Sequence, residues 1–129
     1  MADIPNILRN AKNIAIVGLS DKPSRDSYMI AKHLQNAGYN IFPVNPTIDE
    51  WNGQKSYPTV QSIDEDIDIV DVFRRSEHVP EIVEQTMEKG ADVLWLQLGI
   101  HHDDAVKKAE KAGITVVQDA CIKVEHMHL

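Results

Sequence analysis

Short apolar runs alternate along this chain with amphipathic segments that end at glycine, and this alternation constrains the fold more than any other feature. Strands are predicted for five apolar runs, at residues 13–17, 39–44, 67–73, 91–98 and 114–118. Three intervening segments have apolar residues at helical spacing, and each is followed by a glycine, a common helix C-cap: 27–37, 79–89 and 103–112. Strands that are apolar throughout are typical of parallel sheets with helices on both faces.

The pattern therefore predicts an α/β fold, a single Rossmann-like doubly wound parallel sheet of about five strands with helices on both faces. With the strands counted along the chain, we expect the strand order 3-2-1-4-5. A short helix is expected at residues 4–12 and a turn-rich stretch at 47–58. The length of 129 residues suits one domain with a proper core, and we expect residues 1–129 to form that single domain.

Charge and composition exclude several classes of protein. The net charge of −7 opposes general binding of nucleic acid, which needs a cationic face. No apolar run approaches the roughly 18 residues of a membrane span, and the N-terminus has no secretory signal. Cys121 is the only cysteine, so no internal disulfide can form. We expect a cytoplasmic protein that binds neither nucleic acid nor membrane; a homo-oligomer or an unidentified protein partner is compatible with the sequence.

The loop after the first predicted strand has the composition of a phosphate-binding loop. It lies directly before a predicted helix and contains Gly18, Ser20, Lys22, Ser24, Arg25 and Ser27. Backbone N–H groups and the dipole at a helix N-terminus favour an anion, and an arginine can hold phosphate through two hydrogen bonds. The dinucleotide signature G-x-G-x-x-G is absent, because Gly18 is the only glycine here. The alternative is an ordinary capped helix start, with Asp26 or Ser27 as the N-cap and Arg25 as a solvated charge.

Residues that follow the other predicted strands complete the set of candidates, because ligands of open α/β sheets bind beyond the carboxyl ends of the strands. The candidates are Asn45, Pro46, Phe73, Arg74, Arg75, Gln97 and Gly99. The second strand ends without the acid that NAD-binding proteins use to hold the ribose hydroxyls. Two structural alternatives remain open: Asn45-Pro46 as a rigid turn, and the two arginines as surface salt bridges.

Three groups of potentially reactive residues have no partner at a defining spacing. The pair His101 and His102 follows the fourth strand, Cys121 follows the fifth, and His126 and His128 lie near the end. Asp103 or Asp104 is expected to cap the helix that follows the histidine pair. A small buried thiol is the simpler interpretation of Cys121, and His126 and His128 could hold a metal only weakly without further ligands. We therefore expect no catalytic residue and no metal site.

Taken together, these motifs resemble the small stand-alone CoA-binding domain proteins, a Rossmann-like family similar to the N-terminal domain of the succinyl-CoA synthetase α subunit. The resemblance runs from about residue 10 to the end of the chain and is carried by residues 16–20, 23–27, 38–39, 43–46, 53, 68–75 and 95–100. Family members often have Cys-Pro-Lys where this chain has Cys121-Ile-Lys123.

The resemblance implies that coenzyme A is the ligand, and it assigns the candidates to parts of that molecule. The pyrophosphate region would be held by Gly18, Ser20, Arg25 and Ser27. Asn45 and Pro46 would contact the adenosine part. The adenine and phosphate side would be lined by Val72, Phe73, Arg74 and Arg75. Gln97 and Gly99 would flank the path of the pantetheine arm.

The expected function is binding of coenzyme A, or of an acyl-CoA, by a non-catalytic carrier, sensor or regulatory protein. The related ligase needs a second domain with a phosphorylated histidine and a nucleotide-grasping β subunit, and this sequence carries neither. Two alternatives remain. One is an enzyme that acts on an acyl-CoA or nucleotide through Cys121 or the His101/His102 pair. The other is an NAD-binding redox-sensing module, which would require a DNA-binding partner domain.

Overall fold

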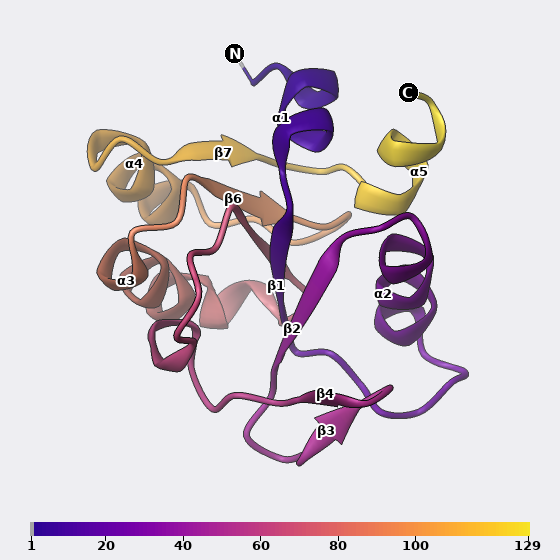
Figure 1. Ribbon diagram of the computed structural model, residues 1–129. Coiled ribbons are helices and arrows are strands. Elements are labelled where there is room, and N and C mark those ends of the chain that lie inside the picture. Colours follow the sequence, from indigo (N-terminus) through magenta and orange to yellow (C-terminus); the bar gives the residue numbers. More distant parts are fainter. Residues whose placement is uncertain (1) are drawn as a thin grey trace.

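The computed structural model describes residues 2–129 as a parallel sheet with helices on both faces (Figure 1). The five strands of the sheet are β1 (Asn13–Val17), β2 (Asn40–Val44), β5 (Ile69–Val72), β6 (Val93–Leu96) and β7 (Thr115–Val117). The α-helices are α1 (Ile4–Asn10), α2 (Asp26–Asn36), α3 (Val79–Lys89), α4 (Asp103–Lys111) and α5 (Ile122–Met127). These elements confirm the predicted α/β class and Rossmann-like sheet.

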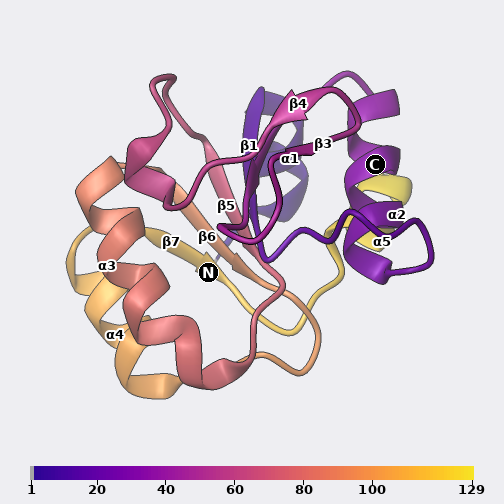
Figure 2. The ribbon, with the colours of Figure 1, turned by 90° about the horizontal axis from the view of Figure 1, so that it is seen from below.

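The helices form two layers, which Figure 2 shows on opposite sides of the sheet. One layer contains α3 and α4, and the other contains α2 and α5, with α1 packed beside α5. Each layer buries its own apolar cluster against the sheet. Val70 and Leu94 belong to the cluster beneath α3 and α4, whereas Ile16 and Trp95 belong to the other. No helix within residues 2–129 is long and apolar enough to span a membrane.

The predicted strand order 3-2-1-4-5 is wrong, because the third strand along the chain lies beside the first. The observed order is β2-β1-β5-β6-β7, so β2 is an edge strand. Pro43 supplies a physical reason. Its carbonyl oxygen accepts a hydrogen bond from the Tyr57 N–H (2.9 Å) on the outer edge of β2. The missing N–H of a proline would point the same way, so this edge cannot pair fully with another strand.

The turn-rich stretch between β2 and β5 covers that outer edge. It contains a two-stranded hairpin, β3 (Glu50–Trp51) with β4 (Gln54–Lys55), and a 3₁₀ turn at Val60–Ser62. Tyr57 forms a parallel bridge with Val44. Trp51 is 1% exposed and anchors the hairpin beneath α2. The stretch therefore closes the sheet where the expected order would have placed the third strand.

One polar side chain lies unpaired inside the sheet. Asp71 is completely buried on β5, where its neighbours in register are Ile16 and Trp95. Neither of its carboxyl oxygens has a hydrogen-bond partner within residues 2–129. Burial raises the pKa of Asp71 well above its usual value, so the carboxyl group holds its proton more tightly than an exposed aspartate does.

Candidate functional site

The loop after β1 turns sharply at Gly18 and passes close to the end of β5. Gly18 has a φ of +86°, which favours glycine, and its N–H donates to the Val44 carbonyl at 2.9 Å. A Cβ atom at this position would lie 2.7 Å from the carbonyl oxygen of Phe73. Leu19, fully buried, then fixes the loop in the core beneath α2. Both the turn and the close approach therefore require glycine at residue 18.

Serine hydroxyls hold the rest of the loop in place. The backbone N–H of Ser20 donates to Ser27 Oγ (3.1 Å), and the N–H of Lys22 donates to Ser20 Oγ (3.1 Å). The Arg25 N–H donates to the Lys22 carbonyl at 3.0 Å. These bonds shape a short loop whose ends lie on β1 and on the start of α2, so the predicted loop residues are brought together at one place.

The N-terminus of α2 has no capping side chain within residues 2–129, so the alternative with Asp26 or Ser27 as the N-cap is wrong. The helix begins at Asp26 and Arg25 occupies the N-cap position, without a side-chain hydrogen bond. Ser27 instead lies in the first turn and accepts from the Ser20 N–H. An uncapped helix N-terminus leaves N–H groups of the first turn available to an anion. The Ser27 hydroxyl, which would be the acceptor in a simple N-cap, stabilises the loop instead.

Asn45 connects the end of β2 to the loop through its carboxamide. Its Nδ2 group donates to the Leu19 carbonyl (2.9 Å), and its Oδ1 accepts from both the backbone N–H and the hydroxyl of Thr47 (2.9 and 2.7 Å). The Asn45 N–H also donates to the Tyr57 carbonyl. Asn45 thus positions the turn, as one of the two interpretations expected, and its side chain is already committed to these bonds.

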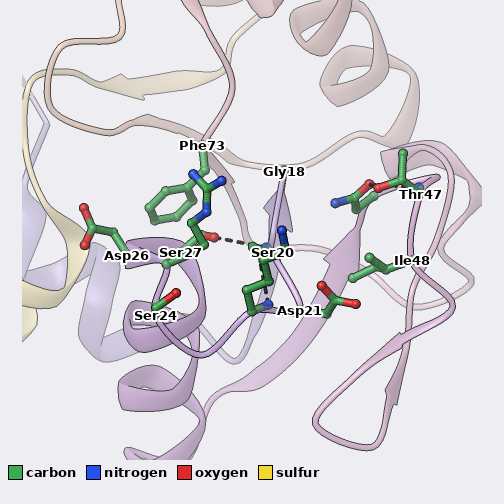
Figure 3. A pocket seen from close by; sticks show the side chains of 12 residues that line it. Gly18, Ser20, Asp21, Ser24, Asp26, Ser27, Thr47, Ile48 and Phe73 are labelled. Carbon is green, nitrogen blue, oxygen red and sulfur yellow. Dashed lines mark hydrogen bonds between the residues drawn. The ribbon is translucent and has the colours of Figure 1, made fainter.

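These elements enclose an open pocket of about 630 Å³ at the carboxyl ends of β1 and β2 (Figure 3). Its lining comprises Gly18, Ser20, Asp21, Lys22, Ser24, Arg25, Asp26, Ser27, Asn45, Thr47, Ile48 and Phe73. In Figure 3, Phe73 lies next to the first turn of α2, whereas Thr47 and Ile48 lie on the opposite side of the loop. We call this cavity the loop pocket.

Four charged side chains line the loop pocket. Lys22 and Arg25 are cationic, Asp21 and Asp26 are anionic, and none of them forms an ion pair within residues 2–129. The two cations are therefore free to meet a bound anion.

A second pocket of about 380 Å³ adjoins the loop pocket, and we call it the arm pocket. It is lined by Asp26, Ile30, Phe73, Arg74, Arg75, Gln97, Leu98, Ile100 and Cys121. Asp26 and Phe73 line both pockets, so the two cavities meet across the start of α2. Together they follow the carboxyl edge of the sheet from β2 to β7, where ligands of open α/β sheets bind.

The structure brings most of the candidate residues to these pockets but leaves three outside their linings: Pro46, Val72 and Gly99. Val72 is completely buried, and its side chain belongs to the core beneath α3 and α4. Pro46 and Gly99 are exposed in neighbouring turns. Arg75 is mostly solvent-exposed and approaches Glu77 only at 4.0 Å, so the expected pair of surface salt bridges is reduced to one weak contact within residues 2–129.

Sequence reasoning missed several residues that line the two pockets. They are Asp21, Asp26, Ile30, Thr47, Ile48, Leu98 and Ile100. Thr47 and Ile48 directly follow the Asn45-Pro46 turn, and this position in the sequence could have indicated that they line the pocket. Ile30 on α2 and Ile100 after β6 line one pocket only in the folded protein, and no local pattern in the sequence predicts this.

Three histidine side chains have structural partners. His102 is the N-cap of α4, and its Nδ1 accepts from the Ala105 N–H at 3.2 Å, which corrects the expectation that Asp103 or Asp104 is the cap. His126 Nδ1 lies 2.9 Å from His33 Nε2, which joins α5 to α2. Burial together with the neighbouring His126 and Lys123 lowers the pKa of His33.

Comparison with known proteins identifies relatives of this chain. A family model described as a CoA binding domain matches residues 12–127. The protein YneT of Bacillus subtilis (strain 168) is 50% identical over 125 residues, which cover 97% of this chain and 93% of YneT. The ADP-forming acetate–CoA ligase of Methanocaldococcus jannaschii is 26% identical over 92% of this chain, and the match spans 18% of that longer protein.

Solved structures agree with this assignment. A hypothetical protein from Pyrococcus horikoshii OT3 has a TM-score of 0.96 and 42% identity, and the match covers 98% of this chain and 89% of that one. An acetyl-coenzyme A synthetase from Candidatus Korarchaeum cryptofilum shares the fold at 24% identity, with a TM-score of 0.76 and coverage of 89% and 27%. The resemblance inferred from the sequence is thus confirmed, and the chain belongs to the CoA-binding domain family.

Proposed function

We propose that this protein binds coenzyme A, or an acyl-CoA, along the carboxyl edge of its sheet, and acts as a non-catalytic carrier, sensor or regulatory protein of the cytoplasm. The observation that carries the proposal is the N-terminus of α2, which has no side-chain cap within residues 2–129 and faces a pocket whose two cations form no ion pair within those residues. Family membership and the ADP-forming acetate–CoA ligases among its relatives support the same ligand. In this proposal residues 1–129 act as one CoA-binding domain.

The loop pocket would receive the phosphates. Ser20 and Ser27 shape the loop, and the N–H groups of the first turn of α2 point toward the site, where the helix dipole favours negative charge. Lys22 and Arg25 would add charge-assisted hydrogen bonds to phosphate oxygens. The close approach of the Gly18 backbone to Phe73 leaves no room for a side chain at this position of the loop.

The two ends of the ligand would then extend in opposite directions. The adenosine part would lie toward Asn45, Pro46 and the neighbouring Thr47 and Ile48, with Phe73 on the other side. The pantetheine arm would enter the arm pocket, past Arg74 and Arg75, toward Gln97 and Gly99. Val72 would contribute only its backbone, because its side chain points into the opposite core.

The end of β2 favours coenzyme A over NAD. Proteins that bind NAD place an acidic side chain here for the ribose hydroxyls, whereas this chain has Asn45. The Asn45 carboxamide is already bonded to Leu19 and Thr47, so it has little capacity left for two ribose hydroxyls. The site therefore lacks the group that discriminates for NAD.

Thermal unfolding with different nucleotides tests the proposal. CoA at 100 times its Kd should stabilise the protein by about 2.7 kcal/mol, whereas NAD and NADP at the same concentration should have little effect. ADP serves as a fragment control, because it carries a pyrophosphate without the pantetheine arm. A clear stabilisation by NAD with none by CoA or acetyl-CoA would refute the proposal.

A further inference from the structure

Cys121 lines the arm pocket, where the pantetheine arm is proposed to end. It is half-buried at the N-cap of α5 and shares the cavity with Phe73, Arg74 and Gln97. It is also the only cysteine of the chain. Any disulfide at Cys121 therefore joins this chain to another molecule, which can be a small thiol held in the pocket.

Gln97 is an independent sign that the arm pocket accepts a ligand. Its side chain lines the pocket although the residue is only 6% exposed. The carboxamide oxygen accepts from the Ile122 N–H at 3.2 Å, and this bond fixes the orientation of the amide because a backbone N–H can only donate. The Nε2 group donates no side-chain hydrogen bond within residues 2–129, and it is not one of the buried atoms that lack a partner, so it is open to the pocket. This free donor can bond a carbonyl group on a ligand.

The surroundings of Gln97 match the chemistry of the pantetheine arm. Ile30, Phe73 and Ile100 give the pocket apolar walls, and the arm itself alternates short apolar chains with amide carbonyls. Gln97 and Cys121 lie at the ends of the adjacent strands β6 and β7, and the Gln97–Ile122 hydrogen bond ties these ends together. A ligand whose amide carbonyl meets Gln97 therefore lies next to the turn that carries Cys121.

We propose that Cys121 is a thiol–disulfide exchange site for bound CoA. The Cys121 thiolate attacks one sulfur of CoA disulfide, the S–S bond of the CoA disulfide breaks, a Cys121–S–S–CoA bond forms, and one CoA thiolate leaves. CoA disulfide is the oxidant, and one disulfide is consumed for each one formed. Reduced CoA or another thiol reverses the step, so the adduct reports the ratio of oxidised to reduced CoA. The inference rests on the proposed function, because CoA must occupy the two pockets.

Intact-mass spectrometry of the reduced full chain tests this step. The protein is incubated with CoA disulfide or, separately, with glutathione disulfide at the same concentration. Binding raises the effective concentration of the reacting sulfur, so the CoA adduct should form at least about tenfold faster than the glutathione adduct. Desulfo-CoA, which lacks the reacting thiol, should compete with CoA disulfide for the two pockets and so slow the CoA reaction. The adduct should be absent from Cys121→Ser.

The outcomes separate this inference from the function on which it rests. Equal rates with the two disulfides, together with calorimetric binding of desulfo-CoA to the wild-type chain, would overturn the exchange site and leave CoA binding intact. Absence of any binding of desulfo-CoA by calorimetry would overturn the proposed function itself. Arg25→Ala should slow the CoA reaction and leave the glutathione reaction unchanged, while Arg9→Ala on the exposed surface of α1 is the matched control and should change neither.

Discussion

Replacement of Gly18 by alanine tests both the geometry of the loop and its role in the site. The left-handed φ of +86° costs a non-glycine residue about 1–2 kcal/mol. The new Cβ would lie 2.7 Å from the Phe73 carbonyl oxygen and 2.9 Å from Arg74 Cδ, and relief of the backbone contact requires a shift that costs about 1–3 kcal/mol more. Gly18→Ala should therefore lower the free energy of unfolding by about 2–5 kcal/mol, from the sum of these two costs.

Gly90→Ala is the matched control for this prediction. Gly90 ends α3 with a φ of +80°, and no atom lies within 4 Å of the position that its Cβ would take. Gly90→Ala should lower the free energy of unfolding only by the conformational cost of a left-handed φ, about 1–2 kcal/mol. Urea unfolding without ligand measures both variants. Calorimetry should also show weaker CoA binding for Gly18→Ala alone. Equal losses of stability in the two variants would refute the argument that the end of β5 requires glycine at residue 18.

Three further predictions concern single side chains. Arg25→Ala should weaken CoA binding by roughly 1–3 kcal/mol in calorimetry, and Arg9→Ala should not; unchanged affinity would make Arg25 a solvated charge. Burial raises the pKa of Asp71 in the folded protein above the unfolded value of about 3.9, so the wild type loses stability as the pH rises above that unfolded value. Asp71→Asn has no carboxyl group to ionise, and its stability relative to the wild type should therefore increase as the pH rises. A difference between the two proteins that stays constant from pH 4 to pH 8 in urea unfolding would contradict the raised pKa. His102→Ala removes the acceptor of the Ala105 N–H and should cost about 1 kcal/mol of stability without affecting CoA affinity.

The local parts of the fold were predictable from the sequence. Apolar runs and helix-terminating glycines indicated all five sheet strands, and α3 was predicted with its observed bounds, Val79–Lys89. The loop pocket was also predictable in outline. Gly18, Lys22 and Arg25 follow the first strand directly, and the edge of an open α/β sheet is where such residues meet a ligand.

The strand order and the helix caps depended on contacts that a local pattern does not report. The observed order follows from the segment around Tyr57, which covers the outer edge of β2. Pro43 was a sequence signal against a central position for that strand, because a proline has no N–H to donate to a neighbouring strand. Ser27 was one of two alternative caps for α2, but its hydroxyl accepts from the Ser20 N–H across the loop instead, and this is a contact between elements. His102 became a cap through a ring nitrogen, an acceptor that capping preferences rarely include.

The arm pocket was the least predictable part of the site. Its lining combines side chains from α2, the ends of β5 and β6, and the turn before α5. Gln97 and Cys121 were each recognisable as residues at a strand end. Their juxtaposition depends on the Gln97–Ile122 hydrogen bond, which forms only when α5 packs against the sheet.

The central claim is that CoA lies across the start of α2 with its phosphates in the loop pocket. The most direct measurement is an NMR titration of isotopically labelled protein with CoA, in which the backbone amide signals are followed residue by residue. The amides of residues 18–28 should shift most, those of residues 97–98 should shift next, and those of α3 should stay in place. Saturable binding of CoA with the signals of residues 18–28 unmoved would contradict the account.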